Sequence, residues 1–293
     1  MLMQHEPPQL EERPAVATTA PRPPTAKRRR LRYPPLALLI RINRYLVGLA
    51  AVTAFVIAWN ELSLHHVHWI LDFSNVPSAQ SVARHFWLAL HSHSFYVNVL
   101  ISLRRVWISF IIAAVLGIVI GLTMARLTVM RMIFYPFVEL FRPIPAIAWI
   151  PLAILMFPTT ESSILFITFL GALFPIILNT FRGACQTPEQ LMRAARSLGA
   201  SRRSVLWHVV IPSAMPNIVT GLVVGMGISW FSLLTGEMIG GQNGIGNYTW
   251  EAYQLIRYPD IIVGMIAIGL LSTLSTYALQ LACSPLIRWS KAS

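Results

Sequence analysis

The sequence contains the stretch VWISFIIAAVLGIVIGLTMA, residues 106–125, which runs for 20 residues without a charged side chain. An α-helix rises about 1.5 Å per residue, so this stretch would extend about 30 Å, the thickness of the hydrocarbon core of a bilayer. We therefore expect residues 106–125 to form a membrane-spanning helix.

Further apolar blocks lie on both sides of this stretch. Together with it they predict about six transmembrane helices, at residues 45–60, 106–125, 134–157, 162–181, 216–236 and 261–283. Residues 1–34 are rich in proline and arginine and show no apolar period, which indicates a disordered basic tail. The sequence thus predicts an all-α integral membrane protein in which residues 35–293 form the transmembrane domain.

The composition excludes an ordinary soluble protein. Hydrophobic residues make up 55% of the chain and charged residues only 12%, whereas soluble domains carry about 25% charged residues. The net charge of +12 is compatible with nucleic-acid binding, but the basic residues lie in short segments beside the apolar blocks. That placement follows the positive-inside rule, so we expect a lipid bilayer and no nucleic acid as partner.

The distribution of the basic residues also predicts the orientation. If the N-terminus lies inside, the segments predicted to be cytoplasmic carry 18 Lys and Arg, and those predicted to lie outside carry four. Because positive charge is retained on the cytoplasmic side, we expect both termini in the cytoplasm.

Residues 187–212, between two predicted spans, show the pattern of a structured segment. Thr187, Pro188 and Gln190 predict a helix start with a capping box, and Gly199 predicts a helix end in the left-handed backbone region. Ser201 is expected to cap a second short helix, which Pro212 would end. Residues expected on one face of the first helix are Leu191, Ala194, Ala195 and Leu198. The pattern alone fits either an amphipathic connector or a docking element.

A resemblance favours docking. The run Arg193-Ala194-Ala195-Arg196-Ser197-Leu198-Gly199-Ala200, followed by Val209-Val210-Ile211-Pro212, resembles the signature of permease subunits of binding-protein-dependent ABC importers. That signature reads Glu-Ala-Ala, three residues, Gly, nine residues, Ile, one residue, Leu-Pro, and the spacing matches throughout, with Arg193 in place of the glutamate. The resemblance implies that this segment couples to a separate ATPase through Arg193, Ala194, Ala195, Ser197, Leu198, Gly199, Ala200 and Ser201.

Two further runs narrow the resemblance to one branch of these permeases. Residues 141–152, and Gly236-Glu237-Met238-Ile239 followed by Gly244-Ile245-Gly246, look like the nitrate/sulfonate/bicarbonate branch. The resemblance covers roughly residues 80–285. It implies a type I ABC importer permease in a bacterial inner membrane, working with a second permease copy (a homodimer), two ATP-binding subunits and a periplasmic substrate-binding protein. Nitrate, sulfonates such as taurine, and bicarbonate are then the first choices of substrate.

The sequence predicts no catalytic or metal site of its own. Its two lysines, Lys27 and Lys291, do not follow a glycine, so the chain lacks the Gly-Lys-Ser/Thr of a P-loop. We therefore expect ATP and Mg on the partner ATPase, and no cofactor on this chain. The eight histidines match no standard zinc spacing, and no serine has a His/Asp set that would indicate an enzyme. A stand-alone secondary transporter or channel is the alternative, although no internal repeat is visible.

Five residues are candidates for the translocation pathway. Glu139 and Arg142 lie three apart in an apolar stretch, so they either pair with each other or leave Arg142 to contact an anionic substrate. Pro145, with the neighbouring prolines, should break the third span, and Trp149 either lines the pathway or packs against lipid. Glu237 ends the fifth predicted span, where it could act in gating, bind a partner residue, or simply be a solvated helix end.

Overall fold

The computed structural model describes the backbone of residues 34–65 and 75–291, and the side-chain surroundings of residues 46–65 and 75–287. Within these ranges all regular structure is helical, as the sequence predicts. The predicted tail lies outside the described residues as far as residue 33. The α-helices are α1 (Pro34–Leu64), α2 (Ala79–Ala89), α3 (His93–Arg126), α4 (Thr128–Phe141), α5 (Ile150–Met156), α6 (Thr160–Cys185), α7 (Glu189–Ser197), α8 (Arg202–Val205), α9 (Ile211–Gly240), α10 (Ile245–Gln254) and α11 (Tyr258–Cys283).

The chain divides into two units, residues 1–54 and residues 55–293, and α1 passes from the first into the second. The second unit contains all the helices from α2 to α11. In α1, the stretch Leu46–Leu64 is long and apolar enough to cross a membrane.

The number of spans agrees with the prediction. Five helices of the described residues are long and apolar enough to cross a membrane, and a bent pair makes six if it is counted as one span. The helices extend beyond the predicted apolar blocks, because polar residues at their ends continue the backbone hydrogen bonding. Helix α3, for example, begins at His93, whereas the predicted span begins at Val106. The five are Leu46–Leu64, His93–Arg126, Thr160–Cys185, Arg202–Gly240 and Tyr258–Ile287.

The centre of the second unit is formed by α3, α6 and α9, which pack closely at glycines. A Cβ atom placed on Gly117 of α3 would lie 2.8 Å from Ile176 of α6, and one on Gly221 of α9 would lie 2.8 Å from Asn179 of α6. Helices can approach this closely only where no side chain stands between their backbones, and packing of this kind stabilises helix pairs in lipid. Val106, Ala113, Ile176 and Met226 are fully buried in the same core.

The bent pair lies where the prolines predict a break. Helix α4 ends at Phe141, a short 3-10 helix η1 (Ala146–Trp149) follows, and α5 continues at an angle of 96° to α4. Pro143 and Pro145 have no N–H group to continue the helical hydrogen bonds, which explains the break. Pro151, in contrast, lies in the first turn of α5 and begins a helix there.

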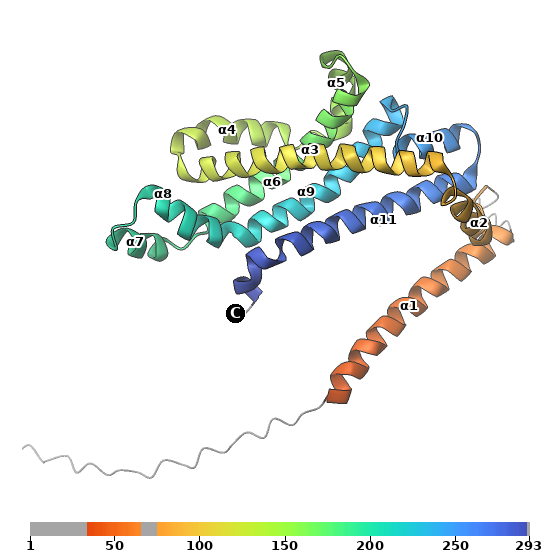
Figure 1. Ribbon diagram of the computed structural model, residues 1–293, viewed down its shortest axis with the longest axis horizontal. Coiled ribbons are helices and arrows are strands. Elements are labelled where there is room, and N and C mark those ends of the chain that lie inside the picture. Colours follow the sequence, from red (N-terminus) through yellow and green to blue (C-terminus); the bar gives the residue numbers. More distant parts are fainter. Residues whose placement is uncertain (1–33, 66–74, 292–293) are drawn as a thin grey trace, which may run out of the picture. The chain divides into compact units, whose positions relative to one another are not determined.

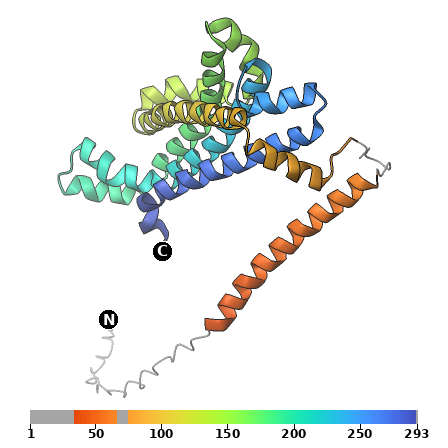
Figure 2. The same ribbon diagram turned by 45° about the vertical axis from the view of Figure 1, so that its right-hand side comes forward.

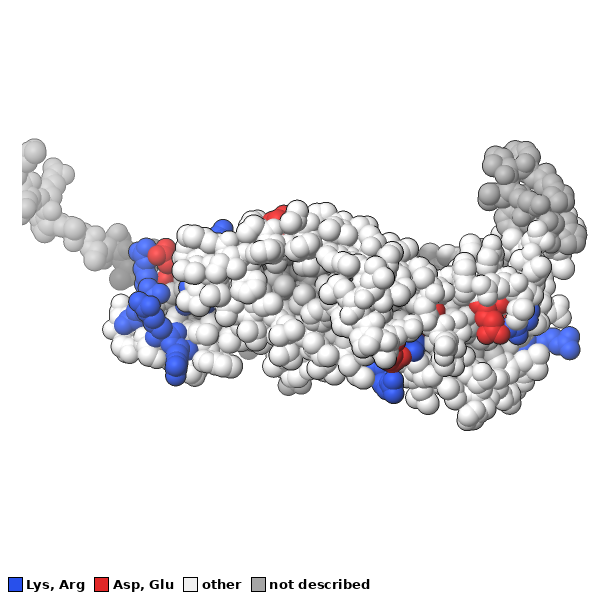
Figure 3. Space-filling model, turned by 90° about the horizontal axis from the view of Figure 1, so that it is seen from above, with Lys and Arg blue, Asp and Glu red and all other residues white. Residues whose placement is uncertain are grey.

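The second unit has two distinct ends. Figures 1 and 2 place α7 and α8 at one end of the bundle, here called the α7 end, and α10 at the other, here called the α10 end. Figure 3 shows Lys and Arg gathered at the α7 end, while the stretch between the two ends is largely without charge. The exposed basic residues there include Arg193, Arg196, Arg202 and Arg203. An uncharged middle between charged ends is the surface expected of a chain that crosses lipid.

Candidate functional site

The segment at the α7 end forms the predicted helix, glycine corner and second helix. Gly199 has φ +83°, and its N–H donates to the carbonyl of Arg196, while the N–H of Ala200 donates to the carbonyl of Ala195. This hydrogen-bond pair with a left-handed glycine is the Schellman motif that ends many helices. Ser201 caps α8, because its side chain accepts from the N–H of Ser204. The predicted left-handed helix end at Gly199 and the predicted cap at Ser201 are confirmed.

Two details of this segment were predicted wrongly. The hydroxyl of Thr187 is buried without a hydrogen-bond partner and does not cap α7, which begins at Glu189 after Pro188. The second helix does not end at Pro212 either: it continues through a π-helical turn, Leu206–Val210, into α9, and Pro212 lies in the first turn of that helix. Proline is compatible with a first turn, since the N–H groups there have no helical partner.

The exposed face of α7 is apolar where the signature predicts docking. Leu198 is 89% exposed and Leu191 is 54% exposed, and Ala194 is exposed beside them. Ala195 does not share this face, as it packs inward with Met192 against a buried cluster that includes Val205 and Val210. Leu191, Ala194 and Leu198 therefore form an exposed apolar face at a charged end of the bundle.

Arg193, which replaces the glutamate of the signature, forms an ion pair with a residue of its own helix. Its guanidinium donates to Glu189 one helical turn earlier, at 2.8 Å, and both side chains are largely exposed.

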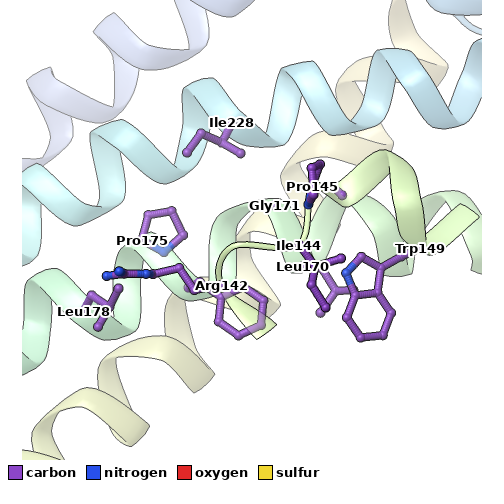
Figure 4. A pocket seen from close by; sticks show the side chains of 11 residues that line it. Arg142, Ile144, Pro145, Trp149, Leu170, Gly171, Pro175, Leu178 and Ile228 are labelled. Atoms are coloured by element: carbon purple, nitrogen blue, oxygen red, sulfur yellow. The ribbon is translucent and has the colours of Figure 1, made fainter. Parts of the chain in front are cut away.

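Three of the predicted pathway residues line one cavity, of about 260 Å³, beside the break between α4 and α5. Arg142, Pro145 and Trp149 come from the break itself, and the opposite wall is provided by α6 and by Ile228 of α9. Figure 4 shows the Arg142 side chain extending past Pro175 toward Leu178, with Trp149 on the other side of the break. The cavity is otherwise lined by apolar side chains and glycine, so Arg142 is its only charged lining residue among the described residues.

Glu139 does not line this cavity, but its carboxylate pairs with the guanidinium of Arg142. The two side chains form an ion pair of 3.4 Å, and each is more than a third exposed. The first of the two alternatives, a pair between these side chains, is therefore present. It leaves most of the hydrogen-bonding capacity of the guanidinium free, since 3.4 Å is long for a hydrogen bond.

Glu237 lies elsewhere, at the α10 end, in a buried network of charges. It is 1% exposed, and its carboxylate accepts hydrogen bonds from Arg105 at 2.9 Å, from Ser102 at 2.8 Å and from the N–H of Gly246 at 3.0 Å. The interpretation of Glu237 as a solvated helix end is wrong. A carboxylate buried this deeply requires a cationic partner and several donors, and α3 and the turn after α9 supply them.

Arg105 connects this network to a third helix. Its side chain is 7% exposed and also donates to Glu161 of α6 at 2.9 Å and to the carbonyl of Asn243 at 2.7 Å. The exposed Arg104 pairs with the same Glu161 at 2.9 Å, so two arginines balance two glutamates. The network therefore ties together α3, α6, α9 and the turn that leads to α10.

The turn between α9 and α10 is shaped around the Glu237 carboxylate. Gly244 has φ +121°, and a Cβ atom there would collide with the carboxylate. The N–H of Gly244 donates to Asn98 and the N–H of Ile245 donates to Ser102, both at 2.9 Å. This geometry explains why Glu237 is followed by glycines at 244 and 246.

The sequence reasoning missed Arg105, Ser102 and Glu161. Asn98, Ser102 and Arg105 are four and three residues apart, so they lie on one face of α3 just before its apolar block. That spacing was the available signal, but the prediction placed Arg105 in an outer segment, because the span was started at the first uncharged residue.

Among the described residues, no group of three or more His, Cys, Asp and Glu side chains could hold a metal ion. His85, one of the eight histidines, contacts Asp260 at 2.8 Å.

Five to six helices long and apolar enough to cross a membrane, a bent helix pair beside a cavity and an exposed helical corner at one end fit a membrane transport subunit. The chain belongs to the family described as binding-protein-dependent transport system inner membrane component, whose family model matches residues 113–288. It is therefore the permease subunit of an ABC importer and a multi-pass inner membrane protein. It is not an enzyme, since the ATPase of these importers is a separate subunit. The alternative of a stand-alone transporter or channel is not supported.

Curated relatives agree with this assignment. The chain is 33% identical to a putative ABC transporter permease of Methanocaldococcus jannaschii over 258 residues, which is 87% of this chain and 96% of the relative. It is 34% identical to the nitrate import permease NrtB of Synechocystis, over 61% of this chain and 65% of that protein. It is 32% identical to the taurine transport system permease TauC of Escherichia coli, over 64% and 68%.

The same fold occurs in a solved structure. The inward-facing MetNI methionine ABC transporter contains a chain that aligns with a TM-score of 0.53 at 22% identity, covering 66% of this chain and 94% of that one. The predicted fold, a type I importer permease with all-α architecture, is confirmed.

Proposed function

We propose that two copies of this chain form the translocation pathway of an importer for a small oxyanion, and that the segment 187–212 couples this pathway to two ATP-binding subunits that hold ATP and Mg. Relatives named for nitrate, taurine and bicarbonate support this substrate class. In this proposal the α7 end and both termini face the cytoplasm, in line with the 18 basic residues counted on that side. A periplasmic binding protein delivers the substrate to the α10 end.

The observation that carries the substrate class is the position of Arg142. Its guanidinium lies on the wall of an otherwise apolar cavity, beside a break at which the prolines end the regular helix. Guanidinium groups present planar, paired donors that match the oxygens of nitrate, sulfonate and carbonate groups. A cationic side chain at membrane depth is costly, and the weak pairing with Glu139 leaves it available for an anion.

The proposed coupling role of residues 193–201 is supported by geometry of a different kind. Leu198 is almost fully exposed at the corner, and Gly199 adds no side chain beside it. A partner can therefore approach the backbone of the corner closely while covering an apolar side chain.

The substrate role of Arg142 can be separated from a structural role by a matched pair of variants. Complexes of the permease, its ATPase and the binding protein would be reconstituted, and uptake of labelled nitrate, taurine and bicarbonate would be measured. We expect Arg142→Gln to reduce uptake of the true substrate at least about tenfold, the effect of losing a charge-assisted hydrogen bond. Glu139→Gln should leave uptake near the wild-type level, because Arg142 then remains and loses only its competitor.

Equal losses in the two variants would show that the ion pair itself matters and that Arg142 does not contact the substrate. If the wild-type complex transports none of the three solutes but stimulates ATP hydrolysis with another, the oxyanion class is wrong while the importer assignment stands.

A further inference from the structure

A second cavity, of about 430 Å³, lies at the α10 end and has no part in the proposed pathway. It is lined by residues of α2, the start of α3, α10 and the first turn of α11. Phe95 and Ala89, both buried, form its apolar part. The volume falls in the range of about 300–1,000 Å³ that is typical of small-ligand pockets.

The polar lining of this pocket carries charges of both signs. Asp260 is nearly buried and contacts His85 at 2.8 Å, while Arg257 lies 3.6 Å from Asp260 and 3.6 Å from Glu251. The two distances from Arg257 exceed the length of a hydrogen bond, so its donors and the acceptor oxygens opposite them retain bonding capacity. A ligand with one negative and one positive group can accept hydrogen bonds from Arg257 and donate hydrogen bonds to these carboxylate oxygens.

Other polar groups in the pocket are donors. Burial, and next the nearby Asp260 carboxylate, raise the pKa of Tyr248 to about 12, so its hydroxyl stays protonated at neutral pH. Asn98 uses its side-chain oxygen to accept from Gly244, which leaves its amide N–H groups as donors. Because the Tyr248 hydroxyl lies within hydrogen-bonding reach of Asp260, the donors left for an oxyanion are those of Arg257 and Asn98.

The surroundings place the pocket at the level of lipid headgroups. Tryptophan and tyrosine gather at membrane interfaces, where their rings are apolar and their polar tips are wet. Four such side chains are exposed on α2, α3 and α10 around this end: Trp87, Tyr96, Trp250 and Tyr253. Leu88, which lines the pocket, is itself 57% exposed and offers an apolar path out of it. Figure 1 shows α2 and α10 at the same end of the bundle.

We propose that this pocket binds a zwitterionic group in which an ammonium and an oxyanion are a few atoms apart, with Arg257 contacting the oxyanion and Glu251 and Asp260 contacting the ammonium. The phosphoethanolamine headgroup of a phospholipid has this chemistry, and so does free taurine. The aromatic surroundings and the exposed Leu88 favour the lipid as its source. The site does not depend on the identity of the transported solute.

The test uses the purified complex of permease and ATPase, equilibrated in detergent with equal amounts of phosphatidylethanolamine and phosphatidylglycerol. Native mass spectrometry measures which lipid stays bound. Glu251→Gln and Arg257→Gln change side chains that are about half exposed, so both variants should fold, and thermal unfolding checks this. Matched controls are Glu61→Gln and Arg84→Gln, which remove the same charges from exposed positions that do not line the pocket.

We expect the wild-type complex to retain phosphatidylethanolamine preferentially, and each pocket variant to weaken this binding about tenfold, the effect of one lost charge-assisted hydrogen bond. The controls should bind as the wild type does. If no lipid is preferred but taurine raises the unfolding temperature in the wild type and not in the two variants, the same site takes a free zwitterion, which also supports the proposal.

Other outcomes would overturn it. Equal retention of both lipids together with no effect of taurine would mean that the pocket has no zwitterion preference. If phosphatidylglycerol or nitrate binds and only Arg257→Gln weakens the binding, the pocket is a simple anion site.

Discussion

Replacing Arg105 by methionine should destabilise the bundle far more than the same change at its neighbour Arg104. Methionine is similar in length but removes every hydrogen bond that Arg105 donates to Glu237, Glu161 and Asn243. Glu237 would remain 1% exposed with only Ser102 and a backbone N–H to hold its charge. Breaking a buried pair in this way costs about 3–5 kcal/mol. The Arg104 side chain is 65% exposed, and its pair with Glu161 should contribute at most about 1 kcal/mol.

The free energy of unfolding would be measured by titrating the purified protein in mixed micelles with a denaturing detergent, followed by near-UV circular dichroism. The double variant Arg105→Met with Glu237→Met should recover part of the loss, because no uncompensated carboxylate is then buried. Similar losses below about 1 kcal/mol for Arg104→Met and Arg105→Met would refute the reasoning, since the buried network would then stabilise no more than a surface pair.

Two further predictions concern the coupling segment and the assembly. Gly199→Val should strain the corner by about 1–2 kcal/mol, because its φ is +83°, and should abolish ATPase stimulation at normal membrane levels. Gly269→Val, in open space on α11, is the control, and wild-type uptake by Gly199→Val would show that the segment is only a connector. The mass of the detergent-solubilised complex should correspond to two permeases with two ATPases, because Leu155 of α5 is 84% exposed and a second copy would cover it. A single permease per ATPase pair would contradict the homodimer.

The membrane helices could be predicted because apolar length is a local property of the sequence. Residues 106–125 and 162–181 lie within α3 and α6, and Pro143 and Pro145 lie at the observed break. The helix ends were less accurate. Polar residues such as His93 continue a helix past the apolar block, since backbone hydrogen bonds do not depend on side-chain polarity.

In the candidate sites, too, features set by neighbouring residues could be predicted, and contacts between residues far apart in the sequence could not. Gly199 was predicted with its conformation because a helix end needs only its own residues. Glu237 was predicted as a candidate without its partners, because Arg105 is 132 residues away in sequence and Glu161 is on a third helix. Only the packing of α3, α6 and α9 brings these side chains together, and that packing depends on glycines whose partners a single sequence does not reveal.

One continuous helical element connects the coupling segment, the cavity beside Arg142 and the buried network of Glu237. The stretch Arg202–Gly240 begins at the second helix of the coupling segment, contributes Ile228 to the cavity wall and ends with Glu237 in the buried network. Its one irregular part is the π-helical turn Leu206–Val210, followed directly by Pro212 and, within α9, by Pro216. Neither proline can donate a helical hydrogen bond, so this part bends more easily than the rest. The network fixes the far end of the element to α3 and α6, so a displacement of the α7 end would concentrate at this turn. In the proposed importer, movement of the ATPase would therefore bend this element at a hinge near Val210, while Glu237 holds the far end of α9.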